Sequence, residues 1–133
     1  MQDQIYREII LEHWKNPQNY GIIAAADIDM TDLNPLCGDE IHITARIKDN
    51  SIAEVAFESQ GCAISRASAS LYLEEIKGKL VSEVQKRTQQ EVLNLLEVEL
   101  TPARTKCALL VYVALNKGLA DRRSSGSFTR HTK

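Results

Sequence analysis

Apolar residues near the start of the chain recur at spacings of three and four. The positions are Ile5, Ile9, Ile10 and Trp14, and this period predicts an amphipathic helix over about Asp3–Lys15. Pro17 is expected to end the helix, because the residue before a proline is disfavoured in helical conformation. Ile22–Met30 is apolar without a clear period, which predicts an irregular connection.

From Glu40 the apolar period changes to two. Ile41, Ile43, Ala45 and Ile47 alternate with polar residues, which predicts a strand with one buried face. Asp49-Asn50 supplies the turn to a second strand over Ile52–Ser59. The predicted inward face of that strand carries Ala53, Val55 and Phe57. Two strands alone are marginally stable in water, so a third is expected over Asp27–Leu33.

Three further helices are predicted after the strands. The first covers Ala63–Lys77 and is stopped by Gly78. The second, Ser82–Glu97, opens with a Ser-x-x-Gln capping box. The third, Ala103–Ala120, starts after Pro102 and repeats apolar residues at helical spacing: Cys107, Leu110, Val111, Ala114 and Leu115.

The order of these elements predicts an α+β fold in a single domain over residues 1–120. Its expected architecture is a small antiparallel three-stranded sheet packed against several helices, with one layer of helices on one sheet face. Residues 121–133 have no apolar period and contain Arg122, Arg123, Arg130 and Lys133. They are expected to form a flexible basic tail.

Composition narrows the class of protein. With 133 residues, 44% of them hydrophobic, the chain suits one globular core. The net charge of −2 argues against a nucleic-acid partner, because phosphate contacts need an excess of Lys and Arg. No apolar run is long enough to span a membrane, and the polar start, Met1–Arg7, does not resemble a signal peptide. We therefore expect a cytoplasmic protein without a membrane partner.

Three cysteines, Cys37, Cys62 and Cys107, lie at breaks between predicted elements or in the first turns of helices. An odd number excludes a complete set of internal disulfides. Gly38 lets the Cys37 thiolate and the Asp39 carboxylate turn toward one point. Cys107 lies about one turn into its helix, where unpaired N–H groups and the positive helix end favour the thiolate. Each cysteine taken alone is also consistent with a small buried hydrophobic residue.

Together, Cys37, Asp39, Cys62 and Cys107 offer three sulfur atoms and one oxygen atom at one end of the predicted sheet. Such a set suits a tetrahedral metal ion. Zinc accepts this mixture, and iron binds thiolates as single ions or as clusters, so the residue types leave the metal open. The paired C-x2-C motifs of most structural zinc sites are lacking, so the site depends on the whole fold.

Three sequence blocks match a known family. They are Asn34-Pro35-Leu36-Cys37-Gly38-Asp39, Gly61-Cys62-Ala63-Ile64-Ser65-Arg66-Ala67-Ser68-Ala69-Ser70 and Pro102-Ala103-Arg104-Thr105-Lys106-Cys107-Ala108-Leu109-Leu110. In order and spacing, the match extends over most of the chain, from His13-Trp14-Lys15-Asn16-Pro17 to Leu119. By these blocks the chain resembles the iron-sulfur cluster assembly scaffold family that includes IscU, SufU and the N-terminal domain of NifU.

The resemblance implies a scaffold protein rather than an enzyme. A [2Fe-2S]-type cluster would be assembled with sulfur from a cysteine desulfurase of the SufS, IscS or NifS type and passed to apo iron-sulfur proteins. Cys37, Asp39, Cys62 and Cys107 fall on the family's ligand positions, which bind Zn2+ in cluster-free forms. Asp39 falls on the aspartate that is a ligand or promotes cluster release. Cys107 falls on the usual sulfur acceptor, and Cys37 on the alternative acceptor.

Two features depart from the IscU branch. Lys106 stands where IscU has a histidine, and Glu99-Leu100-Thr101-Pro102-Ala103 replaces the L-P-P-V-K chaperone motif. The resemblance therefore implies neither a histidine ligand nor handover by an Hsp70-type chaperone. The Arg104-x-Lys106-Cys107 pattern is more similar to SufU, but the segment 62–107 is too short for the insertion typical of SufU. The chain is thus SufU-like or NifU-like without that insertion.

Arg104 and Lys106 are expected either to offset the negative charge of three thiolates and a carboxylate around a divalent ion or to point into solvent. His42, on the polar face of its strand, is expected to be exposed rather than a ligand. His13 is expected on the helix surface or in packing, and His131 in the tail.

Two alternatives to the scaffold stay open. One is a zinc-dependent sulfurtransferase that accepts persulfide and activates a SufS-type desulfurase. The other is a purely structural zinc domain, which the oxygen ligand Asp39 disfavours because permanent structural sites use sulfur and nitrogen ligands.

Overall fold

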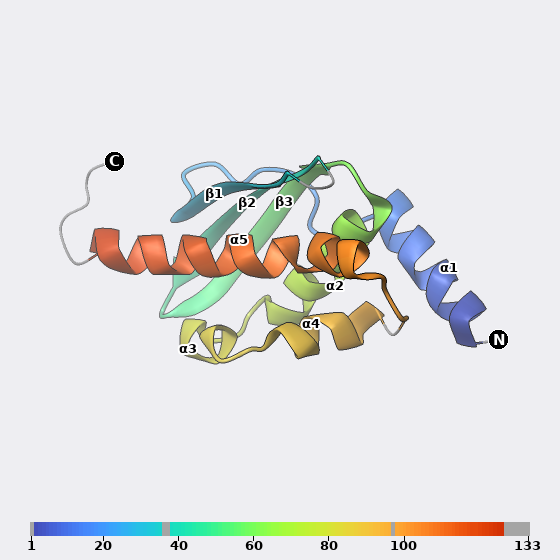
Figure 1. Ribbon diagram of the computed structural model, residues 1–133. Coiled ribbons are helices and arrows are strands. Elements are labelled where there is room, and N and C mark those ends of the chain that lie inside the picture. Colours follow the sequence, from blue (N-terminus) through green and yellow to red (C-terminus); the bar gives the residue numbers. More distant parts are fainter. Residues whose placement is uncertain (1, 36–37, 97, 127–133) are drawn as a thin grey trace.

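The structure, a computed structural model, describes residues 2–35, 38–96 and 98–126. The elements in chain order are α1 (Gln2–Lys15), β1 (Ile28–Asn34), β2 (Asp39–Lys48), β3 (Ser51–Gln60), α2 (Ala63–Ile76), α3 (Val81–Gln85), α4 (Gln89–Leu96) and α5 (Pro102–Gly126). The strands form one antiparallel sheet in the order β1-β2-β3. Helices α2 and α5 pack against this sheet, with α1 and α4 on α2 (Figure 1). The predicted α+β class is confirmed.

The alternating pattern of β2 places its apolar residues in the core. Ile41 and Ile43 are fully buried and lie opposite Ser59 and Phe57 of β3. Thr44, on the other face, is also buried, and its Oγ1 accepts the N–H of Ile23 at 3.0 Å. The irregular segment before β1 therefore covers part of the face that the alternation predicts to be exposed.

The predicted inward face of β3 is wrong at one position. Ala53 is exposed, whereas its neighbour Ile52 is buried. The cause is a shift of register between Arg46 and Ile47, where β3 has one residue more than β2. Such a bulge reverses the alternation locally, and the sequence pattern of a single strand does not reveal it.

The two edges of the sheet differ. The outer edge of β3 is covered near its middle, because Tyr20 bridges to Phe57 and the N–H of Gly21 donates to the carbonyl of Phe57 at 2.8 Å. Near its start, Leu80 bridges to Ser51. Within the described parts of the chain, no strand or bridge covers the outer edge of β1.

The segment predicted as one helix, Ser82–Glu97, is two helices, α3 and α4. The capping box lies at the start of α4 instead of at Ser82. The N–H of Thr88 donates to the Glu91 carboxylate at 2.9 Å, and the N–H of Glu91 donates to Thr88 Oγ1 at 3.3 Å. These reciprocal bonds start a new helix and so interrupt the apolar period.

Helix α5 crosses the sheet with its backbone close to β1. A Cβ atom added at Gly118 would lie 2.6 Å from Cγ2 of Ile28, so only glycine permits this approach. The helix continues to Gly126 and thus includes part of the segment predicted as a tail from residue 121, whereas residues 127–133 lie outside the described residues. In the described part of the chain, none of the helices is both apolar and long enough to cross a bilayer.

Candidate metal centre

Three elements distant in sequence meet at one end of the sheet. Asp39 is the first residue of β2, Cys62 is the N-cap of α2, and Cys107 lies in α5. The atoms that these residues could offer to a metal all lie within 4.8 Å of one another. The structure therefore brings together three of the four residues proposed from the sequence, while Cys37 lies outside the described residues.

The Asp39 side chain is fully buried, and its two oxygens differ. Oδ1 accepts the backbone N–H of Cys62 at 2.7 Å. Oδ2 is buried and has no hydrogen-bond partner among the described residues. A buried acceptor without a partner is destabilising by about 1–3 kcal/mol. A metal ion bound to Oδ2 would remove this penalty. The lack of a described partner for Oδ2 therefore supports a metal site independently of the residue types.

Gly61 makes room for this carboxylate. Its φ of +117° lies in the region that L-residues rarely adopt, and a Cβ at this position would lie 2.2 Å from Asp39 Oδ1. Only glycine therefore lets the Asp39 carboxylate lie against the backbone that carries Cys62.

The sulfur of Cys62 has two donors around it. The N–H of Ile64, in the first turn of α2, donates to Sγ at 3.3 Å. The guanidinium of Arg104 approaches the same sulfur at 3.9 Å from the first turn of α5. This position is compatible with the first of the two expectations for Arg104, that its positive charge offsets negative charge at the candidate site, which stays a prediction.

Cys107 is buried in a small apolar cluster at this end of the molecule, with Ile10, Ile64, Ala67, Leu96 and Ala108. Cys107 is the sixth residue of α5, and the backbone hydrogen bonds of the helix begin before it, since the N–H of Thr105 donates to the carbonyl of Thr101 at 2.8 Å. The expectation of unpaired helix N–H groups at Cys107 is therefore wrong. Instead, Nδ2 of Asn34, at the end of β1, approaches Sγ at 3.9 Å.

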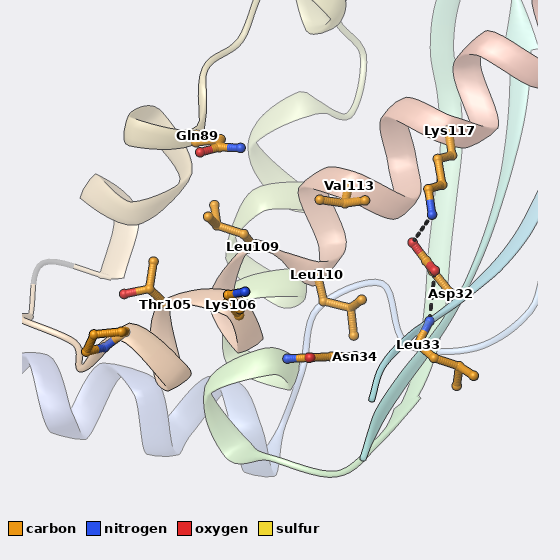
Figure 2. Close-up of a pocket in the computed structure, with 11 residues that line it drawn as sticks. Asp32, Leu33, Asn34, Gln89, Thr105, Lys106, Leu109, Leu110, Val113 and Lys117 are labelled. Carbon is orange, nitrogen blue, oxygen red and sulfur yellow. Dashed lines mark hydrogen bonds and ion pairs between the residues drawn. The ribbon is translucent and has the colours of Figure 1, made fainter. Parts of the chain in front are cut away.

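The other candidates lie elsewhere. Lys106 is exposed and lines a groove beside α5 (Figure 2). His13 contacts Ser70 Oγ through Nδ1 at 2.7 Å and so links α1 to α2. His42 lies on the outer face of the sheet, where Nε2 contacts the Asp29 carboxylate at 2.6 Å. His131 lies outside the described residues.

Sequence reasoning did not assign a role to Asn34 or Gly61. Both stand in the matched blocks, Asn34 at the start of the first and Gly61 directly before Cys62. Their position in these blocks was the signal that the sequence offered. Their roles depend on contacts between different elements: Asn34 contacts Cys107, and Gly61 leaves room for the Asp39 carboxylate.

Comparisons with known proteins agree with this geometry. A family model described as the NifU-like N terminal domain matches residues 5–126. The zinc-dependent sulfurtransferase SufU of Bacillus subtilis is 35% identical and aligns over 89% of this chain and 91% of its own length. The iron-sulfur cluster assembly scaffold protein IscU of Escherichia coli is 32% identical over 90% of this chain and 94% of its own.

The solved structures agree as well. A SUF-system iron-sulfur cluster assembly scaffold protein from Fervidobacterium islandicum is 30% identical, with a TM-score of 0.76, over 90% of this chain and 99% of its own. The alignment with the Bacillus SufU extends over 136 residues, more than the 133 of this chain. That SufU therefore has residues within the aligned part that this chain lacks.

Proposed function

Because the chain belongs to the family of NifU-like N-terminal domains, we propose that it is a scaffold on which an iron-sulfur cluster is assembled for transfer to apo-proteins. The observation that carries this proposal is the buried Oδ2 of Asp39, which has no hydrogen-bond partner among the described residues and lies beside the sulfurs of Cys62 and Cys107. Cys37 would complete a set of three sulfurs and one oxygen. The cluster is cargo, of the [2Fe-2S] type, rather than a resident cofactor.

A mixed set of ligands suits transient binding. Thiolates are soft ligands that hold iron and zinc well, whereas a carboxylate oxygen is harder and exchanges more readily at a thiolate-bound cluster. Asp39 is therefore the ligand that would promote release. Rotation of the Asp39 carboxylate is restricted, because Oδ1 accepts a hydrogen bond from the N–H of Cys62.

Sulfur would arrive as a persulfide on a cysteine desulfurase of the SufS, IscS or NifS type. The Cys107 thiolate attacks the outer sulfur, the S–S bond of the donor breaks, and a new S–S bond forms on Cys107. The donor leaves as a thiolate, and no net oxidation occurs. Cys37 is the alternative acceptor in this step.

A second candidate function is zinc-dependent sulfur transfer. The 35% identity to the Bacillus SufU supports it, together with Lys106 before Cys107 and the contact between Arg104 and Cys62. In this function the same four residues would hold Zn2+, and one of the cysteines, exchanging away from the ion, would accept the persulfide of a SufS-type desulfurase. The desulfurase would then turn over faster.

One experiment separates the two functions. The chain is purified without oxygen, and its metal and acid-labile sulfide are measured with an absorbance spectrum, before and after incubation with a desulfurase, cysteine and iron. Sulfide with visible charge-transfer bands, lost in Cys62→Ser, supports the scaffold. One tightly bound zinc ion per chain, faster desulfurase turnover and no sulfide would replace it with sulfur transfer. Full unfolding on metal removal with neither activity would contradict both and indicate a structural zinc domain.

A further inference from the structure

Asn34 is the last residue of β1 and is turned into the molecule. It is 7% exposed, whereas the preceding residue, Leu33, is 59% exposed. Neighbouring residues of a strand point to opposite faces of the sheet, so the Asn34 side chain lies on the face that the helices cover (Figure 2). A buried amide is costly unless it makes polar contacts, so its contacts indicate why it is there.

The backbone of Asn34 is fixed to the strand that provides Asp39. The two residues are partners in the antiparallel register of β1 and β2. The carbonyl of Asn34 also accepts the N–H of Gly38 at 2.8 Å, between the two strands. Both contacts involve the main chain, so they do not depend on which side chain stands at position 34.

The side chain of Asn34 contacts a different element. Its Nδ2 approaches Sγ of Cys107 in α5 at 3.9 Å, in a buried contact. A neutral thiol is a weak acceptor, but a thiolate that binds a metal carries negative charge, and hydrogen bonds to charged groups are about twice as strong as neutral ones. Cys107 otherwise lies in an apolar cluster. An amide N–H at this position would therefore stabilise the sulfur as a metal ligand.

Asn34 thus connects two candidate ligands from different elements. Its main chain fixes its position relative to Asp39, and its amide contacts the sulfur of Cys107. The atoms that Asp39, Cys62 and Cys107 offer to a metal lie within 4.8 Å of one another. Groups that hydrogen-bond to metal ligands orient these ligands and change the affinity for the metal.

We propose that Asn34 is a positioning residue of the metal centre. Its amide N–H donates to the Cys107 sulfur and holds this sulfur within reach of a metal that Asp39 and Cys62 bind. The proposal rests on the proposed function in one respect, that Cys107 is a ligand. It applies to an iron-sulfur cluster and to Zn2+ alike, because both would bind the same sulfur.

The test compares variants of the full chain by titration with Co2+, followed by absorbance. Asn34→Leu has a similar volume and retains the main-chain pairing but removes the amide, whereas Asn34→Gln retains an amide. Ser70→Ala controls for a general loss of stability. Ser70 is fully buried, and its Oγ accepts the N–H of Gln18 at 2.8 Å and contacts His13 at 2.7 Å, so its contacts do not involve the centre.

We expect Asn34→Leu to lower the affinity for Co2+ by about 10- to 100-fold. The sulfur-to-cobalt charge-transfer band should also move to lower energy, because an electron leaves the sulfur more easily when no hydrogen bond stabilises its charge. Asn34→Gln should bind Co2+ more tightly than Asn34→Leu and restore the band. Ser70→Ala should lower the free energy of unfolding but leave the affinity and the band unchanged.

A second measurement needs no metal. In 15N NMR spectra of the metal-free chain, the side-chain amide signals of Asn34 should move in Cys107→Ala and stay in place in Ser70→Ala. Signals that do not move in Cys107→Ala would overturn the contact and with it the proposal.

The outcomes separate this proposal from the proposed function. Unchanged affinity and band position in Asn34→Leu would overturn the proposal, while binding of Co2+ by the parent would still support the metal centre. Equal loss of affinity in Ser70→Ala would also overturn it, because the effect would then follow stability alone. A parent chain that binds no Co2+ would contradict the metal centre itself, and so both the proposed function and the role of Asn34.

Discussion

The Asp39 carboxylate accepts the backbone N–H of Cys62 at 2.7 Å, so the residue that offers oxygen also positions the residue that offers sulfur. This bond joins the start of β2 to the N-cap of α2 across the turn at Gly61. The remaining oxygen of Asp39 is buried without a partner among the described residues. One hydrogen bond thus sets which carboxylate oxygen would face a metal ion in the proposed centre.

Replacing Gly61 with alanine should therefore impair metal binding. The new Cβ would lie 2.2 Å from Asp39 Oδ1 and would displace the carboxylate. Loss of such supporting contacts typically lowers metal affinity by about 10- to 100-fold. Titration with Co2+, followed by its absorbance bands, measures the effect. Gly78→Ala is the matched control, because Gly78 also has a positive φ but nothing lies within 4 Å of an added Cβ. Equal loss of affinity in both variants would contradict the role of Gly61.

Replacing Asp39 with alanine should slow cluster release. The variant would keep three sulfur ligands and an open position that water or added thiol fills, and the cluster would lose its hardest ligand. Transfer to an apo-ferredoxin, followed by circular dichroism, gives the rate. Asp29→Ala serves as control, because the Asp29 side chain is 68% exposed and pairs with His42 instead. Equal release rates from Asp39→Ala and the parent would refute a role in release.

Replacing Cys107 with serine should abolish sulfur acceptance from a desulfurase. A serine hydroxyl does not attack a persulfide under conditions where a thiolate does. Mass spectrometry of alkylated peptides after incubation with desulfurase and cysteine locates the persulfide. Persulfide found on Cys37 in both the parent and the variant would make Cys37 the acceptor.

The buried phenol of Tyr72 predicts a loss of stability at high pH. Burial raises the pKa of Tyr72 to about 12, and the positive charge of Arg87 lowers this pKa only in part. The unfolded phenol has a pKa of about 10. Because the folded state holds the proton more tightly, the contribution is complete below about pH 10 and is lost as the pH rises from about 10 to 12.

The comparison with Tyr72→Phe isolates this effect. From pH 9 to 12 the parent should lose about 2–3 kcal/mol more unfolding free energy than the variant. Below pH 9 the variant should be at least as stable, because Tyr72 Oη has no hydrogen-bond partner among the described residues. Urea unfolding at several pH values gives both curves, and parallel curves would contradict the assignment.

Replacing Gly118 with alanine tests how closely α5 approaches β1. In an open helix this change stabilises by about 1 kcal/mol. Here the new methyl group would lie 2.6 Å from Cγ2 of Ile28, so we expect destabilisation of about 1–3 kcal/mol. The double variant with Ile28→Ala should recover part of this loss, because the clashing atom is absent. If Gly118→Ala alone were more stable than the parent, α5 would be able to shift away from β1 without loss of unfolding free energy, which would contradict this prediction.

Local pattern determined much of the fold. The alternation around Ile41 and Ile43 predicted a strand with one buried face, and turn residues such as Asp49-Asn50 predicted the hairpin. These features follow from backbone geometry over a few residues, so they can be read in a sequence without knowing what packs against it. The cysteines and Asp39 were likewise recognisable by residue type and by the blocks around them.

Tertiary structure alone decided which residues support the candidate metal centre and where the groove beside α5 lies. Gly61 supports the site because the Asp39 carboxylate occupies the space that a side chain at position 61 would fill. Asn34 supports it because α5 places Cys107 next to the Asn34 amide. The exposure of Ala53 and the burial of Thr44 depend on a bulge and on a covering loop. Each is a contact between distant segments, and a periodic pattern in one segment contains no information on its neighbour in space.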